Sequence, residues 1–247
     1  MIAIQAADIE DLRRFDPRKF EGNPYQALFH DLESSTSSDG VSNEDGKENL
    51  ARFALKSFVQ IQTTVTRMRN SGAARFKFKF RGATHAAVND WQNCVHFPRS
   101  DGWFDTKLRL SVVSLECKTR LAEGSRRNSG ECFNPQQFAQ EVADLIGAVL
   151  AQLRYPLPVK HADHETFVIS QHTTILYISS AYLTADYIRY LRTGVLPGGD
   201  HNFSLWVPRS ITFSLNVVHE RGEGLGFLWA LVQYLRSGSA KVNTIHV

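Results

Sequence analysis

The sequence predicts one α/β domain, with a mixed β-sheet and helices packed on it. Three observations favour this class. The stretch RFKFKFRG alternates strictly between apolar and polar residues, several other runs are apolar and rich in β-branched residues, and the longer segments repeat apolar residues every three or four positions. Of the 247 residues, 43% are hydrophobic and 21% are charged, which is ordinary for a globular chain with a sizeable core.

The first 47 residues are predicted to lie outside this domain. Residues 1–33 are expected to form an N-terminal extension that contains a short helix at YQALFHDL. Residues 34–47 are poor in apolar side chains and rich in Ser, Gly and Asp, which predicts a flexible acidic linker. The domain itself is expected to span residues 48–247.

The domain is predicted to begin with a helix over residues 48–70, followed by a strand. The helix is indicated by apolar residues at steps of three and four, namely Leu50, Ala54, Phe58, Ile61, Val65 and Met68. In the strand, phenylalanines occupy one face, Phe76, Phe78 and Phe80, and cations occupy the other, Arg75, Lys77, Lys79 and Arg81. This alternation is typical of a half-buried strand with a cationic outer face.

The remaining elements follow from similar patterns. Two extended segments, AVNDWQNCVHF and GWFDTKLRLSVVSLECK, precede a helix that opens at Pro135. ETFVIS and TILYISSAYL are expected to form a hairpin, and TADYIRYLRTG a helix that stops at its glycine. FSLWVPRSITFSLNV is expected to be extended with a break at Pro208. The last segment, LGFLWALVQYLRSG, is apolar on nearly every side, which predicts a buried helix.

Charge is unevenly distributed although the formal net charge is only +3. Residues 31–48 contain six acids and one base, whereas residues 67–81 contain six bases and no acid. The basic segment is either a solvated face or a surface that contacts the phosphates of a nucleic acid.

The cysteines and the apolar runs favour an intracellular protein. Cys94, Cys117 and Cys132 are 23 and 15 positions apart, which suits neither a zinc site nor a disulfide framework. The first fourteen residues mix acids and bases, unlike a signal peptide. No apolar run approaches the roughly 18 residues of a membrane helix. We therefore expect a location in the nucleus or cytoplasm and no membrane partner.

The strand that ends at Lys118 carries the residues on which a functional hypothesis rests. Alternation places Val113, Leu115 and Cys117 on a core face and Glu116 and Lys118 on the other face. One interpretation is a solvated ion pair, which is a complete structural explanation. The other is half of a metal site.

The metal hypothesis requires a second carboxylate, for which the sequence offers two candidates. Asp105 lies eleven residues before Glu116 and is preferred, whereas Asp101 belongs to the turn-forming stretch RSDG. Two carboxylates and the backbone carbonyl of Cys117 would form a hard-oxygen site suited to Mg²⁺, or alternatively Mn²⁺. Lys118 would then lie beside a metal-bound water during phosphodiester hydrolysis.

These residues resemble the PD-(D/E)XK nuclease superfamily, in particular nuclease-like domains that are common in fungal genomes. The resemblance rests on DTKLRLSVVSLECK as the D(x)nExK motif, on the preceding helix and strand, and on the Gln-bearing helix that follows. It covers residues 48 to about 180, and it implies a restriction-endonuclease-like core in which a mixed sheet is flanked by helices.

The resemblance also implies roles for individual residues. Asp105, or Asp101 in its place, and Glu116 would bind the metal, and Lys118 would assist the nucleophilic water. Acids of the first helix are poorly placed on the helical wheel, whereas Gln137 of the later helix would support the site. The expected function is a Mg²⁺-dependent nuclease acting on DNA or, as an alternative substrate, RNA. A catalytically inactive module that binds nucleic acid or a protein is the alternative function.

Overall fold

The computed structural model describes the part of the chain that carries the sheet and its helices. The described residues are 68–71, 74–80, 83–95, 110–118, 135–153, 161–172, 175–199, 203–215, 217–237 and 239–242. The predicted N-terminal extension, the acidic linker and residues 48–67 of the first expected helix lie outside these ranges.

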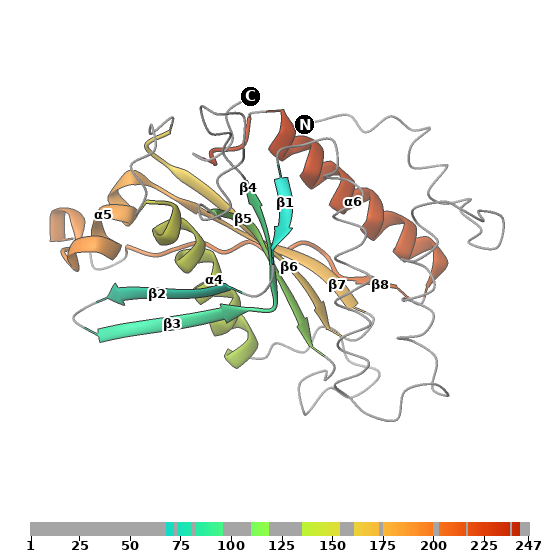
Figure 1. Ribbon diagram of the computed structural model, residues 1–247, viewed down its shortest axis with the longest axis horizontal. Helices are drawn as coiled ribbons and strands as arrows, with labels where there is room; N and C mark the ends of the chain where they lie inside the picture. Colours follow the sequence, from blue (N-terminus) through green and yellow to red (C-terminus); the bar gives the residue numbers. More distant parts are fainter. Residues whose placement is uncertain are drawn as a thin grey trace, which may run out of the picture.

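The main sheet is mixed and runs in the order β1-β4-β5-β6-β7-β8 (Figure 1). Its strands are β1 Met68–Ser71, β4 Trp91–Val95, β5 Leu110–Lys118, β6 His164–His172, β7 Ile175–Leu183 and β8 Phe213–Ser214. Strands β5 and β6 pair in parallel, and the other neighbours are antiparallel. The two parallel strands are the central ones, which explains why both are buried along almost their whole length.

Strands β2, Ala74–Phe80, and β3, Ala83–Asn89, form a separate antiparallel hairpin. In Figure 1 this hairpin extends to the left across α4, away from β1 and β4. The alternation in RFKFKFRG is confirmed, because Phe76 and Phe78 are buried whereas Arg75 and Lys77 are exposed.

Three α-helices are described, together with one short 3₁₀ turn at Pro197–Gly199. They are α4 Pro135–Gln152, α5 Ala185–Thr193 and α6 Val218–Arg236. Helix α5 begins where its sequence predicts, because the hydroxyl of Thr184 accepts a hydrogen bond from the backbone N–H of Tyr187 at 3.2 Å. It ends at Gly194, whose φ of 74° is in the left-handed region.

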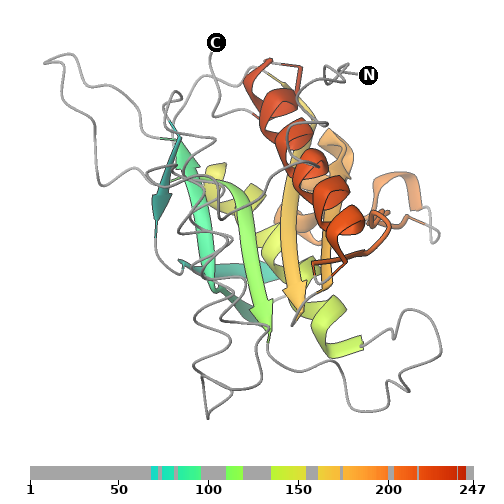
Figure 2. The same cartoon turned by 90° about the vertical axis from the view of Figure 1, so that its right-hand side faces the viewer.

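Helices α4 and α6 cover opposite faces of the main sheet. In Figure 2, α6 lies in front of β6 and β7, and α4 lies behind them. Residues of one parity, such as Leu115 and Ile169, belong to the apolar cluster that includes α6. Val168, of the other parity, packs with Leu145 and Val149 of α4. The described chain is therefore a mixed α/β structure with two sheets.

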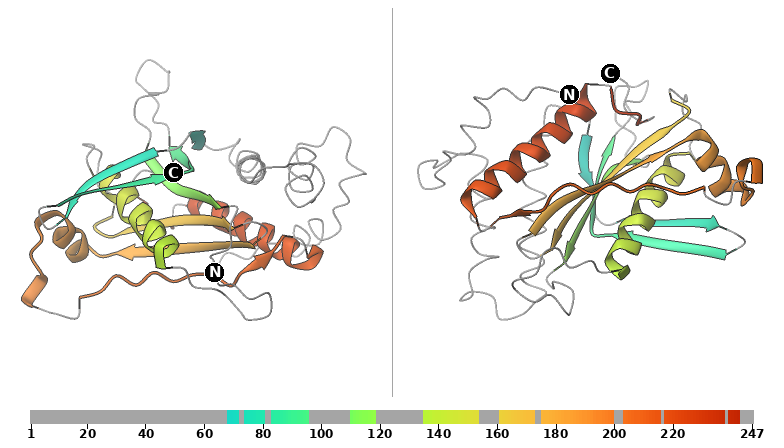
Figure 3. Two further views of the ribbon diagram at one scale, coloured as in Figure 1. Left: turned by 90° about the horizontal axis from the view of Figure 1, so that it is seen from below. Right: turned by 180° about the vertical axis from the view of Figure 1, so that it is seen from behind.

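The β2–β3 hairpin is held by close packing on α4. Figure 3, viewed from below, shows the hairpin alongside this helix. Phe76 and Ala87 form a small buried cluster with Ala148 of α4. A Cβ atom at Gly147 would lie 2.5 Å from the Cβ of Phe76, so only glycine allows this approach.

Two predictions about the elements are corrected. Residues 68–70, expected at the end of a helix, form strand β1 because their backbone pairs with β4. Helix α6 begins at Val218 rather than near Leu225, and it is not buried on every side, with Phe227 43% exposed. Residues 203–212, expected to be extended with a break at Pro208, run along the edge of β7, where a single bridge joins Arg209 to Ser179.

Candidate functional site

Glu116 is buried between the sheet and α4. Its strand separates two faces as predicted, since Val113, Leu115 and Cys117 belong to the apolar cluster of α6. Glu116 has the opposite parity and is only 3% exposed. Burial of a carboxylate without polar neighbours costs free energy, so the groups around Glu116 bear on its role in the protein.

Asp90 is the acid that the structure brings to this strand. It forms the bend between β3 and β4 and immediately precedes Trp91, which pairs with Leu115 of β5. Its Oδ2 accepts a hydrogen bond from the backbone N–H of Cys117 at 2.8 Å. The Asp90 carboxylate therefore lies at the peptide group that joins Glu116 to Cys117.

Asp90 could not be predicted from its distance along the chain, because it lies outside the fifteen residues before Glu116 that contain Asp101 and Asp105. Asp90 precedes Glu116 by 26 positions. One feature of the sequence could have indicated Asp90, which is its position inside the extended stretch AVNDWQNCVHF. The chain bends at this residue between β3 and β4, and β4 then pairs with β5.

The other predicted site residues have different outcomes. Asp105 and Asp101 lie outside the described residues, so neither assignment is tested. Lys118 is the last residue of β5, and its backbone pairs with His172 of β6. Gln137 is half-buried near the start of α4, one turn before Glu141.

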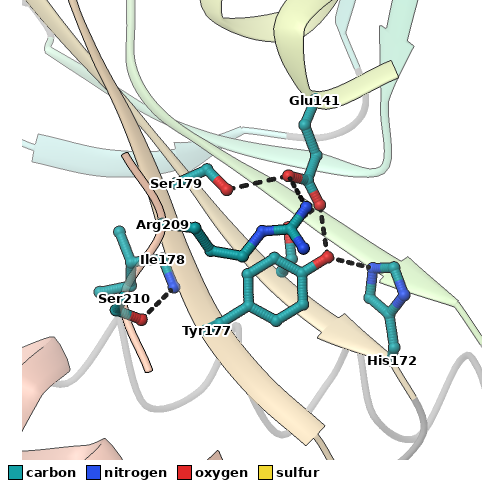
Figure 4. A network of polar contacts seen from close by, with 8 residues as sticks. Glu141, His172, Tyr177, Ile178, Ser179, Arg209 and Ser210 are labelled. Carbon is teal, nitrogen blue, oxygen red and sulfur yellow. Dashed lines mark hydrogen bonds and ion pairs between the residues drawn. The ribbon is translucent and has the colours of Figure 1, made fainter. Parts of the chain in front are cut away.

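Glu141 of α4 points toward the sheet, and its carboxylate is surrounded by donors (Figure 4). The side chain has no exposed surface. The donors are Ser170 Oγ at 2.9 Å, Tyr177 OH at 2.5 Å, Ser179 Oγ at 2.9 Å and Arg209 Nη2 at 3.2 Å. We call these residues with His172 the Glu141 network. Such a donor set stabilises an ionised carboxylate.

The network also includes His172. Burial, and next the charge of Glu141, raise the pKa of Tyr177 above its usual value, so its hydroxyl stays protonated. The single hydroxyl proton is donated to Glu141. His172 Nε2 lies 3.1 Å from the same hydroxyl, so a hydrogen bond between them requires the tautomer in which this nitrogen is the donor.

The Glu141 network adjoins the Asp90–Glu116 pair through the parallel register of β5 and β6. Ser170, which donates to Glu141, is the register partner of Glu116 on one side and of Tyr177 on the other. The network thus fixes the strand against which Glu116 lies. By helical periodicity Glu141 lies at the flank of the apolar stripe of α4, and a polar residue in that position gives no sequence signal of burial.

The predicted cationic face is partly described. Arg75 and Lys77 are exposed on the outer face of β2. Opposite them on β3 lie Val88 and Ala86, which are uncharged. The side chain of Lys79 and all of Arg81 lie outside the described part of the chain.

Two cavities lie away from Glu116. One, of about 590 Å³, is bordered by Ile178, Pro208 and Phe227, and the other, of about 490 Å³, by Tyr187 and Trp206. Within the described ranges, no three His, Cys, Asp or Glu side chains are grouped as metal ligands. None of the described helices has the length and apolar character needed to cross a membrane.

Comparison with known proteins does not assign a family. No protein-family model matches the chain, and no curated protein matches its sequence.

Proposed function

We propose that the chain is a divalent-metal-dependent nuclease with a restriction-endonuclease-like core. The observation that carries this proposal is the position of the Asp90 carboxylate at the backbone N–H of Cys117, the residue after Glu116. Asp90 would supply the acid that the D(x)nExK resemblance requires. The nuclease acts inside the cell, in the nucleus or cytoplasm, and its substrate is DNA.

The donor set of this site fits Mg²⁺ or Mn²⁺. Asp90 and Glu116 offer carboxylate oxygens, and Cys117, between Glu116 and Lys118 in the chain, offers a backbone carbonyl. Hard oxygen donors of this kind suit Mg²⁺, which commonly keeps several waters and uses only one or two carboxylates. When bound, the ion would lower the pKa of a water and offset charge on the attacked phosphate. Asp105 and Asp101 remain candidates for a further carboxylate.

The chain's own residues then have separate roles. Asp90 and Glu116 would hold the ion, and Lys118 would orient the attacking water. The Glu141 network keeps Ser170 and β6 in place beside Glu116, because four donors tie one carboxylate to two strands and to the 203–212 segment. Gln137 supports the site from the first turn of α4.

A specific observation favours the alternative function, a catalytically inactive nuclease-like module. Glu116 is 3% exposed, and the described cavities do not include it. A carboxylate enclosed by the folded chain would act as a structural acid rather than as a metal ligand. The two functions differ in one measurable property, which is whether cleavage depends on Asp90, Glu116 and added metal.

The test is a cleavage assay with duplex DNA, single-stranded DNA and RNA during titration of Mg²⁺ and Mn²⁺. We expect Asp90→Asn, Glu116→Gln and Lys118→Ala each to lower metal-dependent cleavage by at least about 100-fold. Asn at position 90 retains an oxygen that accepts from the Cys117 N–H, so the fold is preserved. Metal binding itself is followed by calorimetry with Mn²⁺, which should weaken in Asp90→Asn and Glu116→Gln.

The matched control is Glu223→Gln, the same chemical change in α6 at a side chain that is 40% exposed. It should retain full activity and metal affinity. Absence of metal-dependent cleavage in the wild type, or equal cleavage in Asp90→Asn and Glu116→Gln, would establish the inactive module instead.

A further inference from the structure

We infer that the β2–β3 hairpin is a two-stranded ribbon that holds duplex DNA by its phosphates and presents it to the Asp90–Glu116 pair. This inference deepens the proposed function and rests on it for the fate of the bound DNA. The binding step is independent of cleavage. It is carried by the charge, the side-chain arrangement and the attachment of the hairpin.

The hairpin combines positive charge with a complete lack of acids. Residues 74–89 contain four Lys or Arg residues and no Asp or Glu. Arg75 and Lys77 are exposed and lie two residues apart on one face of β2. That separation is about 6.8 Å, twice the axial rise of about 3.4 Å per phosphate along one strand of B-DNA. A row of cations at this spacing complements the charge of a duplex backbone.

The arrangement of side chains favours a duplex over a single strand. Single-stranded nucleic acid is bound largely by stacking of its bases on exposed aromatic rings. Here Phe76 and Phe78 point inward and are 6% and 9% exposed, and Phe80 packs edge-on against Tyr190 of α5. On the described outer face, the cross-strand partners of Arg75 and Lys77 are the uncharged Val88 and Ala86. Such a face contacts phosphates but offers no stacking platform.

The shape of the element favours DNA over duplex RNA. The major groove of B-DNA admits a two-stranded β-ribbon, whereas that of A-form RNA is too deep and narrow. Val88 and Ala86, which lie across from Arg75 and Lys77, offer no side-chain hydrogen-bonding group to base edges, so we expect the two cations to contact mainly phosphates and the binding to be largely independent of sequence.

The hairpin is rigidly attached to the candidate site. Asn89, the last residue of β3, donates from Nδ2 to Ser114 Oγ of β5 at 3.0 Å, and both side chains are buried. The next residue is Asp90. Arg75 pairs with Val88, two residues before Asp90, which is about 6.6 Å along the strand. Arg75 is therefore paired with the end of the strand that leads directly into Asp90.

The test measures binding of the full chain to a fluorescent duplex by anisotropy in EDTA, where cleavage does not occur, over a series of salt concentrations. The variant is Arg75→Gln with Lys77→Gln, at two exposed positions. We expect affinity for the duplex to fall roughly tenfold. The slope of log K against log salt should decrease by about 2, close to 0.9 for each lost phosphate contact.

The matched control exchanges the two cations, Arg75→Lys with Lys77→Arg, and retains the charge at both positions. It should bind the duplex within about twofold of the wild type, because a phosphate contact depends mainly on charge. Single-stranded DNA and duplex RNA of the same sequence are measured in parallel, and both should bind more weakly than duplex DNA.

The outcomes separate this inference from the proposed nuclease activity. If the Gln variant binds like the wild type, or if single-stranded DNA or duplex RNA binds as tightly as duplex DNA, the inference is overturned even when cleavage is observed. If binding depends on the hairpin cations but metal-dependent cleavage is absent, the nuclease assignment fails and the ribbon remains a duplex-binding element.

Discussion

At the scale of single residues, burial determines which ionisation state the fold accepts. His164, the first residue of β6, is 1% exposed. Burial, and next the charge of His161, lower its pKa from 6.5 to about 4, although Asp163 acts in the opposite direction. The folded chain therefore holds His164 neutral at pH values where the unfolded chain already binds a proton.

The expected consequence is a loss of stability in mild acid. Because the folded pKa lies below the unfolded one, the contribution is intact above about pH 6.5 and falls as the pH approaches 4. The loss reaches about 3 kcal/mol at most. Urea unfolding between pH 7.5 and 4 should show the wild type losing more stability than His164→Gln.

The control for this prediction is His219→Gln, since His219 lies on α6 with 65% of its side chain exposed. Its pH profile should follow that of the wild type within about 0.5 kcal/mol. Parallel profiles for the wild type and His164→Gln would contradict the role assigned to His164.

At the scale of elements, helix propensity and tertiary contact compete within α4. A glycine inside a helix costs about 1 kcal/mol relative to alanine, so Gly147 weakens α4 taken alone. The hairpin approaches so closely that an alanine methyl group would lie 2.5 Å from Phe76 Cβ. Gly226 of α6 is the opposite case. A Cβ atom there would have no atom within 4 Å apart from its chain neighbours and the backbone of its own helix, so a methyl group fits without overlap.

The two glycines should therefore respond in opposite directions to the same substitution. We expect Gly147→Ala to lower the free energy of unfolding by about 1–3 kcal/mol through overpacking against Phe76. Gly226→Ala should raise it by about 0.5–1 kcal/mol. Urea unfolding at neutral pH measures both. Equal stabilisation by the two substitutions would show that the hairpin does not pack on α4 as described.

At the scale of the whole molecule, Glu141 joins parts of the chain that are distant in sequence. Its carboxylate receives donors from β6, from β7 and from Arg209, 68 positions away. Arg209 also lies over the ring of Tyr177 at 4.4 Å, a cation–π arrangement. The contacts are mutually dependent, since the carboxylate, the hydroxyls and the guanidinium satisfy one another away from water.

Removal of the charge at Glu141 should destabilise the whole fold. Glu141→Gln preserves the shape of the side chain but leaves Arg209, whose side chain is only 19% exposed, without its anion. We expect a loss of about 3 kcal/mol, the lower end for breaking a buried ion pair. Urea unfolding measures it, with the exposed Glu223→Gln as the matched control, expected within about 0.5 kcal/mol of wild type. A loss below about 1 kcal/mol for Glu141→Gln would contradict this role.

Local patterns determined much of the described fold. The alternation of β2, the apolar parity of β5, the pairing of β6 with β7, and the caps of α5 follow from properties of neighbouring residues, which exist before any long-range contact forms. The α/β class with a mixed sheet could be predicted for the same reason. Strand β1 could not be predicted, because its residues continue a helical pattern of apolar positions and become a strand only through pairing with β4.

The candidate site was decided mainly by tertiary structure. The sequence by itself singled out Glu116 and Lys118, because their parity and chemistry are local. Only the pairing of β4 with β5 brings Asp90, 26 positions away, to the Cys117 peptide. Only the packing of α4 on β6 and β7 buries Glu141 among its donors. Strand register and layer packing depend on the whole chain, and short sequence patterns do not contain that information.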